Sequence, residues 1–134
     1  MFREDFVWGV ASSAYQVEGT DAADGRGACV WDMFAADGRV FEHQNADTSC
    51  DHMHHYKEDI ALMKHLGIRA YRFSLNWARI LPEGTGRVNE KAIAMYRAMI
   101  LTMKENGITP YLTLFHWEFP QALYERGGWQ NPDV

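Results

Sequence analysis

A short unit recurs in this chain at a spacing of 40 residues, and it restricts the possible folds more than any other feature. Segments 64–77 and 104–117 share a lysine, a glycine, an isoleucine, a tyrosine and a tryptophan at equivalent places. In each copy the glycine follows a helical pattern, as glycine does at the end of a helix, and a strand-like run comes next. A repeated helix–strand unit is typical of parallel β/α folds. We therefore predict an α/β chain.

The predicted elements are about three parallel strands with intervening helices. We expect strands at residues 6–11, 70–75 and 111–115. We expect helices over about residues 51–66 and from an N-cap at Asn89 onward. One apolar stripe at helical spacing marks the second helix: Ala92, Tyr96, Met99 and Met103. A single helix separates the last two strands, so they should be parallel neighbours with a right-handed crossover.

Composition and motifs exclude several classes of protein. The net charge is −5 and no run of Lys or Arg occurs, which argues against a nucleic-acid partner. No apolar run approaches about 18 residues, so we expect no membrane span. No apolar h-region of the kind found in a signal peptide follows residues 1–5, so we expect no secretion signal and a cytoplasmic protein. Cys29 and Cys50 should then be free thiols rather than a disulfide.

Polar side chains follow each predicted strand. Gln16 comes after the first strand, Asn76 after the second, and His116 with Trp117 after the third. In parallel β/α folds ligands bind at the carboxyl ends of the strands, so we expect these groups on one face. Amide and imidazole groups both donate and accept hydrogen bonds, and beside an aromatic ring they suit a sugar diol.

Motifs along nearly the whole chain resemble those of glycoside hydrolase family 1. The segments that carry the resemblance are Phe6–Gly19, Trp31-Asp32, Tyr71–Ser74, Arg79–Pro82, Asn106–Pro110 and Leu114–Trp117. The resemblance implies a (β/α)8 TIM barrel roughly three times this length. Residues 1–134 would then be a partial barrel domain whose C-terminal remainder is absent.

The resemblance also implies an activity, the retaining hydrolysis of β-glucosides or related small β-glycosides. It implies that Gln16 and His116 bind hydroxyls of the non-reducing sugar and that Trp117 lines the same subsite. Arg72 resembles an arginine that lies against the catalytic nucleophile, with a plain buried ion pair as the alternative. Asn76 stands where serine is common, and a supporting polar contact is expected from it.

Neither catalytic carboxylate of the family has a counterpart in this chain, so we expect no catalytic residue here. A retaining pair needs two carboxyl groups about 5 to 5.5 Å apart. We do not expect Glu18 and Glu118 to be that pair, because the motifs give them neighbouring roles.

No cofactor and no metal are expected. His52, His55 and Asp59 share a helix face, but the resemblance places that helix away from the strand ends, and catalytic zinc needs three convergent ligands. The alternative function is a non-catalytic, self-assembling fragment or sugar-binding module. Three strands cannot close a barrel, so a homo-oligomer or a complex with the missing C-terminal part is expected. Preference among glucosides, galactosides and 6-phospho-glycosides stays open.

Overall fold

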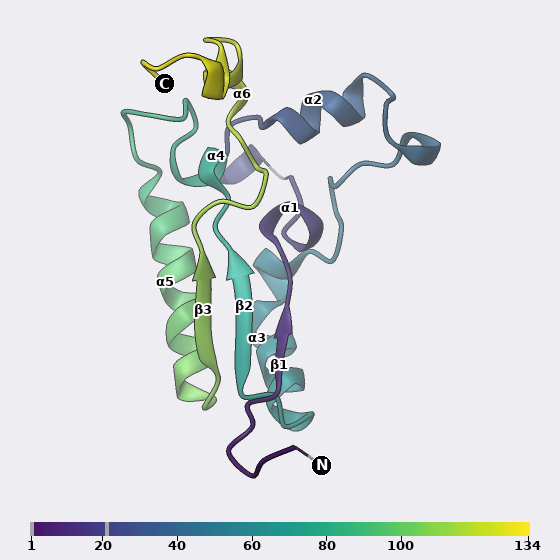
Figure 1. Cartoon of the computed structure of the whole chain (residues 1–134), viewed down its shortest axis with the longest axis vertical. Coiled ribbons are helices and arrows are strands. Elements are labelled where there is room, and N and C mark those ends of the chain that lie inside the picture. Colours follow the sequence, from purple (N-terminus) through teal and green to yellow (C-terminus); the bar gives the residue numbers. More distant parts are fainter. Residues whose placement is uncertain (1, 21) are drawn as a thin grey trace.

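A parallel three-stranded sheet forms the centre of the chain in a computed structural model that describes residues 2–20 and 22–134. The strands are β1 (Gly9–Ala11), β2 (Ala70–Ser74) and β3 (Thr109–Thr113), in that spatial order (Figure 1). β2 pairs in parallel with both neighbours. The predicted α/β class and the parallel pairing of the last two strands are confirmed.

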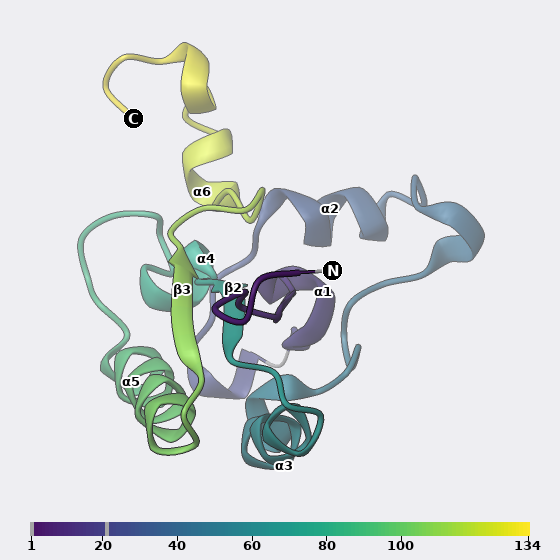
Figure 2. The same cartoon turned by 60° about the horizontal axis from the view of Figure 1, so that its bottom comes forward.

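Two long helices connect the strands and cover one face of the sheet. They are α3 (His52–His65) and α5 (Glu90–Glu105), and both lie on the same side of the strands (Figure 2). Tyr71 and Phe73 point from β2 into the core between sheet and helices. The apolar stripe predicted on the second helix is buried there: Ala92, Tyr96, Met99 and Met103. Its helical spacing turns four side chains toward the sheet, which is what stabilises the layer.

Short elements gather beyond the carboxyl ends of the strands (Figure 1). The α-helical ones are α1 (Ala14–Val17), α2 (Val30–Ala36), α4 (Trp77–Ile80) and α6 (Gln121–Tyr124). Three single 3-10 turns lie at Ala22–Asp24, Phe41–His43 and Gly128–Gln130. This end of the sheet therefore carries most of the irregular backbone. No helix in the described part of the chain is long and apolar enough to cross a membrane.

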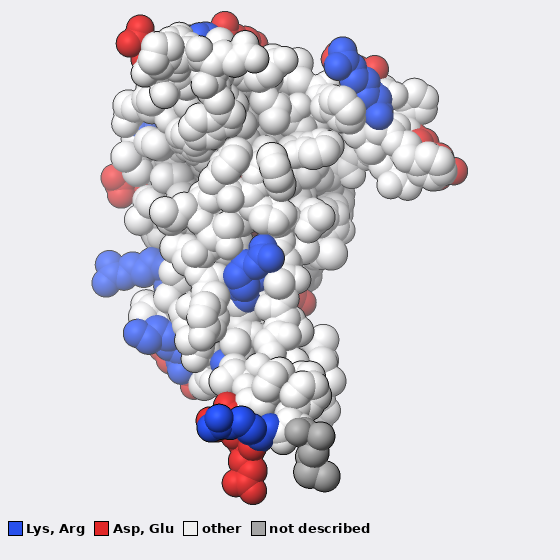
Figure 3. Space-filling model, viewed as in Figure 1, with Lys and Arg blue, Asp and Glu red and all other residues white. Residues whose placement is uncertain are grey.

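None of the helices in the described residues covers the other face of the sheet. Ala11, Arg72 and Tyr111 lie side by side in register on this face, and Tyr111 is 54% exposed. Figure 3 shows that this side of the molecule carries few charged groups over the sheet. Arg72 is exposed, and no described residue forms a salt bridge with it.

The strand boundaries differ from the prediction by one residue in β2 and by two or three residues in β1 and β3. β1 is shorter than residues 6–11, and before it Phe6 and Trp8 pack with Phe2 at ring distances of 4.4–4.9 Å. β3 begins two residues early and includes Pro110. The Thr109 amide donates to Arg69 O at 2.8 Å, so the next residue's backbone turns to the open edge, where proline's missing N–H costs no ladder bond.

Candidate functional site

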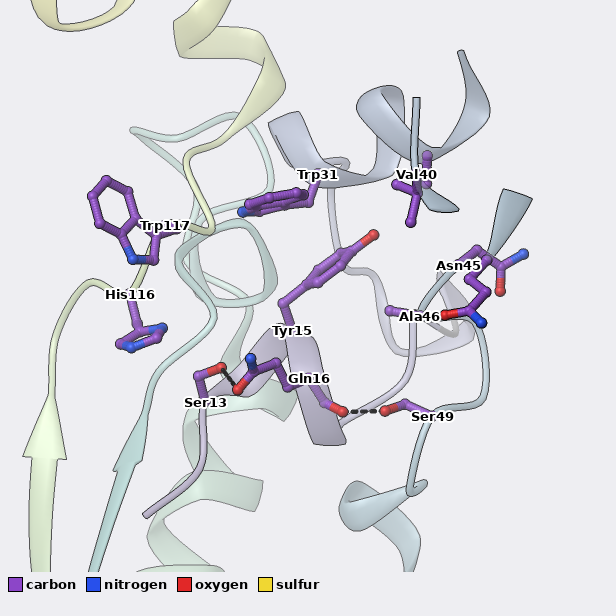
Figure 4. Close-up of a pocket in the computed structure, with 12 residues that line it drawn as sticks. Ser13, Tyr15, Gln16, Trp31, Val40, Asn45, Ala46, Ser49, His116 and Trp117 are labelled. Carbon is purple, nitrogen blue, oxygen red and sulfur yellow. Dashed lines mark hydrogen bonds between the residues drawn. The ribbon is translucent and has the colours of Figure 1, made fainter. Parts of the chain in front are cut away.

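A cavity of about 340 Å³ lies beyond the carboxyl ends of β1 and β3 (Figure 4). Its walls come from α1, α2, the segment before α3 and the turn after β3. The lining residues that matter for binding are Ser13, Tyr15, Gln16, Trp31, His116 and Trp117. The structure thus brings Gln16, His116 and Trp117 into one pocket although a hundred residues separate the first from the others.

Hydrogen bonds hold Gln16 on α1. Ser13 Oγ donates to Gln16 Oε1 at 2.8 Å, and Ser49 Oγ donates to the Gln16 carbonyl oxygen (Figure 4). With its oxygen engaged, the Gln16 amide presents its NH2 group to a ligand. The Gln16 side chain is therefore oriented as a donor.

His116 and Trp117 occupy a turn directly after β3. Trp117 has a φ of 78° and a side chain that is two-thirds exposed, which is an unusual combination for a large residue. Strained backbone of this kind persists only where the surroundings hold it, and it clusters at ligand sites. Across the pocket, Trp31 of α2 and Tyr15 of α1 add two more rings, 6.1 Å apart.

Tyr15 is a neutral hydrogen-bonding group in the pocket lining. Burial raises the pKa of Tyr15 to about 12, with the nearby carboxylate of Asp32 adding to the effect. The Tyr15 phenol therefore keeps its proton at neutral pH and can donate it in a hydrogen bond. Imidazole, phenol and amide groups next to aromatic planes match a sugar ring with its hydroxyl groups.

A buried ion pair between Arg79 and Glu18 holds the end of α1 in place. Arg79 Nε lies 3.2 Å from Glu18 Oε2, and both side chains are almost fully buried. The Tyr96 hydroxyl donates to Glu18 Oε1 at 2.7 Å, and Arg79 also pairs with Asp24. Burial raises the pKa of Glu18 to about 7, since desolvation outweighs the attraction of Arg79 and the bond from Tyr96. This network fixes the segment after Gln16 onto α4 and α5.

Asn76, expected to give a supporting polar contact, does not line this cavity. Asn76 is 1% exposed, and its Oδ1 accepts the Arg79 amide at 3.2 Å as the N-cap of α4. At the N-cap position, a short polar side chain accepts a hydrogen bond from a backbone amide in the first turn of the helix. This bond fixes the orientation of the Asn76 side chain. Arg72 is also absent from the pocket lining. Asn89 is the N-cap residue of α5 as predicted, but its side chain forms no capping hydrogen bond, and its Nδ2 donates to Asp24 O and Arg79 O.

Sequence reasoning missed the pocket contacts of Ser13, Tyr15 and Trp31. Ser13 and Tyr15 flank the polar segment after β1, so the same strand-end rule reaches them. Trp31 depends on where α2 docks, and that is decided by the Val30 amide donating to Phe119 O at 2.9 Å. No local pattern signals such a long-range contact.

The histidine-rich segment at the start of α3 lies outside this pocket. His52 Nδ1 is 2.6 Å from Asp59 Oδ2, and within the described ranges no three His, Cys, Asp or Glu residues form a group that could hold a metal. Cys29 is buried and Cys50 is exposed, and both are free thiols. Burial raises the pKa of Cys29 to about 11, which keeps it an unreactive thiol.

The sequence matches the family described as "Glycosyl hydrolase family 1" over residues 1–134. The chain belongs to this family. Among curated family 1 relatives, "Beta-glucosidase A" of Acetivibrio thermocellus is 47% identical over 134 residues. "Beta-glucosidase A" of Thermotoga maritima is 48% identical, and an aryl-phospho-beta-D-glucosidase of Bacillus subtilis is 44% identical. The alignments cover 99% of this chain but only 28–30% of those relatives.

Solved family 1 structures show the same arrangement. The β-glucosidase of Thermotoga maritima superposes with a TM-score of 0.93 at 50% identity, covering 97% of this chain and 30% of that one. That enzyme has also been solved in complex with castanospermine and with deoxynojirimycin. The three parallel strands with their helices therefore match part of a family 1 TIM barrel, and the chain is homologous to the N-terminal part of such β-glucosidases.

Proposed function

We propose that this chain is the glycone-binding part of a retaining β-glycosidase that hydrolyses β-glucosides. The observation that carries the proposal is the pocket that the Gln16 amide, the His116 imidazole and Trp117 line together. These groups bind and orient the non-reducing sugar, and Trp31 and Tyr15 bound the same space. Family membership and the inhibitor complexes of the Thermotoga maritima relative support a sugar as the ligand.

In this proposal the chain contributes binding and orientation to the reaction. Retaining hydrolysis uses one carboxylate as nucleophile and a second as acid and then base. Glu18 is held by Arg79 and Tyr96, Glu118 is fully buried, and neither lines the pocket. The residues here act by placing the sugar ring and by hydrogen bonds to its hydroxyls that strengthen in the transition state. Both catalytic carboxylates belong to a part of the barrel outside residues 1–134.

The test compares the 134-residue chain with a joined protein. We define the joined protein as residues 1–134 followed by the part of Thermotoga maritima β-glucosidase A that lies after the matched region. We expect the joined protein to release nitrophenol from nitrophenyl β-glucoside, whereas the chain alone does not. Loss of proton transfer by itself costs about 10²- to 10⁴-fold in rate. The same assay with nitrophenyl β-galactoside and nitrophenyl 6-phospho-β-glucoside measures which sugar the joined protein prefers.

A His116→Ala version of each protein controls for contaminating host enzyme. Turnover by the chain alone that disappears in this variant would show that a catalytic pair exists within residues 1–134. A joined protein that folds but neither hydrolyses any of the three substrates nor binds deoxynojirimycin would refute the proposed function.

A further inference from the structure

We propose that Glu118 is a positioning residue of the sugar pocket, and this inference rests on the proposed function. Its carboxylate ties the turn that carries His116 and Trp117 to α1, which carries Gln16. The two hydroxyl-binding groups come from segments far apart in the sequence, so their spacing depends on a direct link between the segments. Glu118 provides that link.

The hydrogen bond between Glu118 and Tyr15, which we call the clamp, joins the turn after β3 to α1. The Glu118 side chain is fully buried, with 0% exposure, and its Oε1 accepts a hydrogen bond from the Tyr15 backbone amide at 2.9 Å. Tyr15 directly precedes Gln16, and Glu118 follows His116 by two residues. A bond from a backbone amide to a carboxylate is shorter and stronger than one between neutral groups. This single contact therefore sets the distance between both halves of the pocket.

The turn after β3 needs such a restraint. Trp117 has a φ of 78°, which a tryptophan adopts only when its neighbours hold it there. The Phe119 amide donates to Trp117 O at 2.8 Å, which closes the turn around Glu118. Phe119 O in turn accepts the Val30 amide at 2.9 Å, so the backbone is held after the turn as well. The Glu118 carboxylate is the restraint on the side that faces α1.

Stability alone does not account for a carboxylate at this position. Glu118 Oε2 is buried and accepts no hydrogen bond from any residue in the described part of the chain. A buried carboxylate with an unsatisfied oxygen costs more than an apolar side chain of the same size. The benefit of Glu118 therefore lies in its bond to Tyr15, which an apolar residue lacks.

The experiment uses Glu118→Met and Glu118→Gln. Methionine keeps the volume and removes the acceptor, whereas glutamine keeps an acceptor oxygen without the charge. Glu58→Met, an exposed site on α3, is the matched control. Two quantities are measured in the joined protein: hydrogen exchange at residues 14–18 by mass spectrometry, and the inhibition constant of deoxynojirimycin.

We expect E118M to fold, to exchange faster at residues 14–18 and to raise the inhibition constant about tenfold, because misplaced hydrogen bonds lose binding energy. The inhibition constant of E118Q should stay within about threefold of that of the unsubstituted joined protein. The inhibition constant of E58M should equal that of the unsubstituted joined protein. An E118M variant with unchanged exchange and inhibition, or an E118Q variant as impaired as E118M, would overturn the proposal. If the joined protein binds no inhibitor, the proposed function fails, while exchange at Tyr15 still tests the clamp.

Discussion

Gln16 and Ser13 show how single residues prepare the pocket for a ligand. The Ser13 hydroxyl donates to the Gln16 amide oxygen, which leaves the NH2 group of the amide available as a donor. An amide that lacked this partner would rotate between two orientations, and only one of them presents a donor. The pair therefore acts as one unit in which Gln16 binds and Ser13 orients.

We predict that Gln16→Ala in the joined protein lowers kcat/KM for nitrophenyl β-glucoside by about 10- to 100-fold, since it removes a hydrogen bond that strengthens in the transition state. Ser13→Ala should lower it by a smaller factor, because the binding group remains but loses its orientation. Glu58→Gln on α3 is the control. A Ser13→Ala effect as large as that of Gln16→Ala would contradict these roles.

The buried carboxyl group of Glu18 makes the stability of the folded chain depend on pH. Its pKa is about 7 in the folded chain, against 4.5 ordinarily, because burial disfavours the charge. The folded state therefore holds more protons than the unfolded state between these pH values. The stabilisation is complete below pH 4.5 and is lost as the pH rises through 7.

We predict that this group makes the joined protein more stable at pH 5 than at pH 7.5. The slope from one proton is at most about 1.4 kcal/mol per pH unit. Urea unfolding of the joined protein and of its Glu18→Gln variant isolates the contribution, since other titrating groups cancel in the difference. Parallel pH dependences in the two proteins would rule out a raised pKa at Glu18.

At the scale of elements, α6 depends on the loop between α4 and α5. Gly84 in that loop has a φ of 77°, and a Cβ placed there would lie 2.3 Å from Leu123 Cγ. The Trp77 indole also donates to Gly84 O at 2.9 Å, which holds the loop in place. Gly86, two residues on, has a similar φ of 78° but nothing within 4 Å of a Cβ.

We predict that Gly84→Ala destabilises the joined protein by about 2–4 kcal/mol, because a clash with buried Leu123 adds to backbone strain. Gly86→Ala introduces the same backbone strain without a clash and should destabilise the joined protein by about 1 kcal/mol. Thermal unfolding compares the two variants. Equal losses of melting temperature would mean that α6 does not pack on Gly84 as the structure shows.

For the whole molecule, the sheet has two unpaired edges and one uncovered face. Leu112 and Leu114 at the β3 edge are 44% and 73% exposed, and Trp129 nearby is 68% exposed. Unpaired edges and contiguous apolar surface recruit other chains. A parallel sheet is stable when both faces are covered, and here helices cover only one.

We predict that the 134-residue chain self-associates or is loosely folded, whereas the joined protein is a compact species. Sedimentation velocity at micromolar concentration gives the mass, and thermal unfolding followed by circular dichroism gives the cooperativity. A monomeric 134-residue chain with a cooperative melt would be evidence against this.

Local patterns in the sequence were sufficient for the elements and for half of the pocket. The stripe from Ala92 to Met103 has helical spacing, so it predicted both α5 and its buried face. The strand-end rule placed Gln16, His116 and Trp117 at one end of the sheet, because parallel strands end at the same edge. The helix prediction depends on neighbours within a few residues, whereas the strand-end placement follows from the parallel arrangement of the strands.

Only the tertiary structure decided which side chains actually meet. Asn76 occupies the expected strand end, yet its side chain accepts a hydrogen bond from the Arg79 amide and caps α4. Trp31 enters the pocket because Phe119 pairs with Val30, and Glu118 reaches Tyr15 across 103 positions. The sequence by itself determined the α/β class, the helical faces and the end of the sheet at which Gln16, His116 and Trp117 gather. The pocket's walls required the folded chain, because contacts between distant segments leave no periodic signal in the residues that make them.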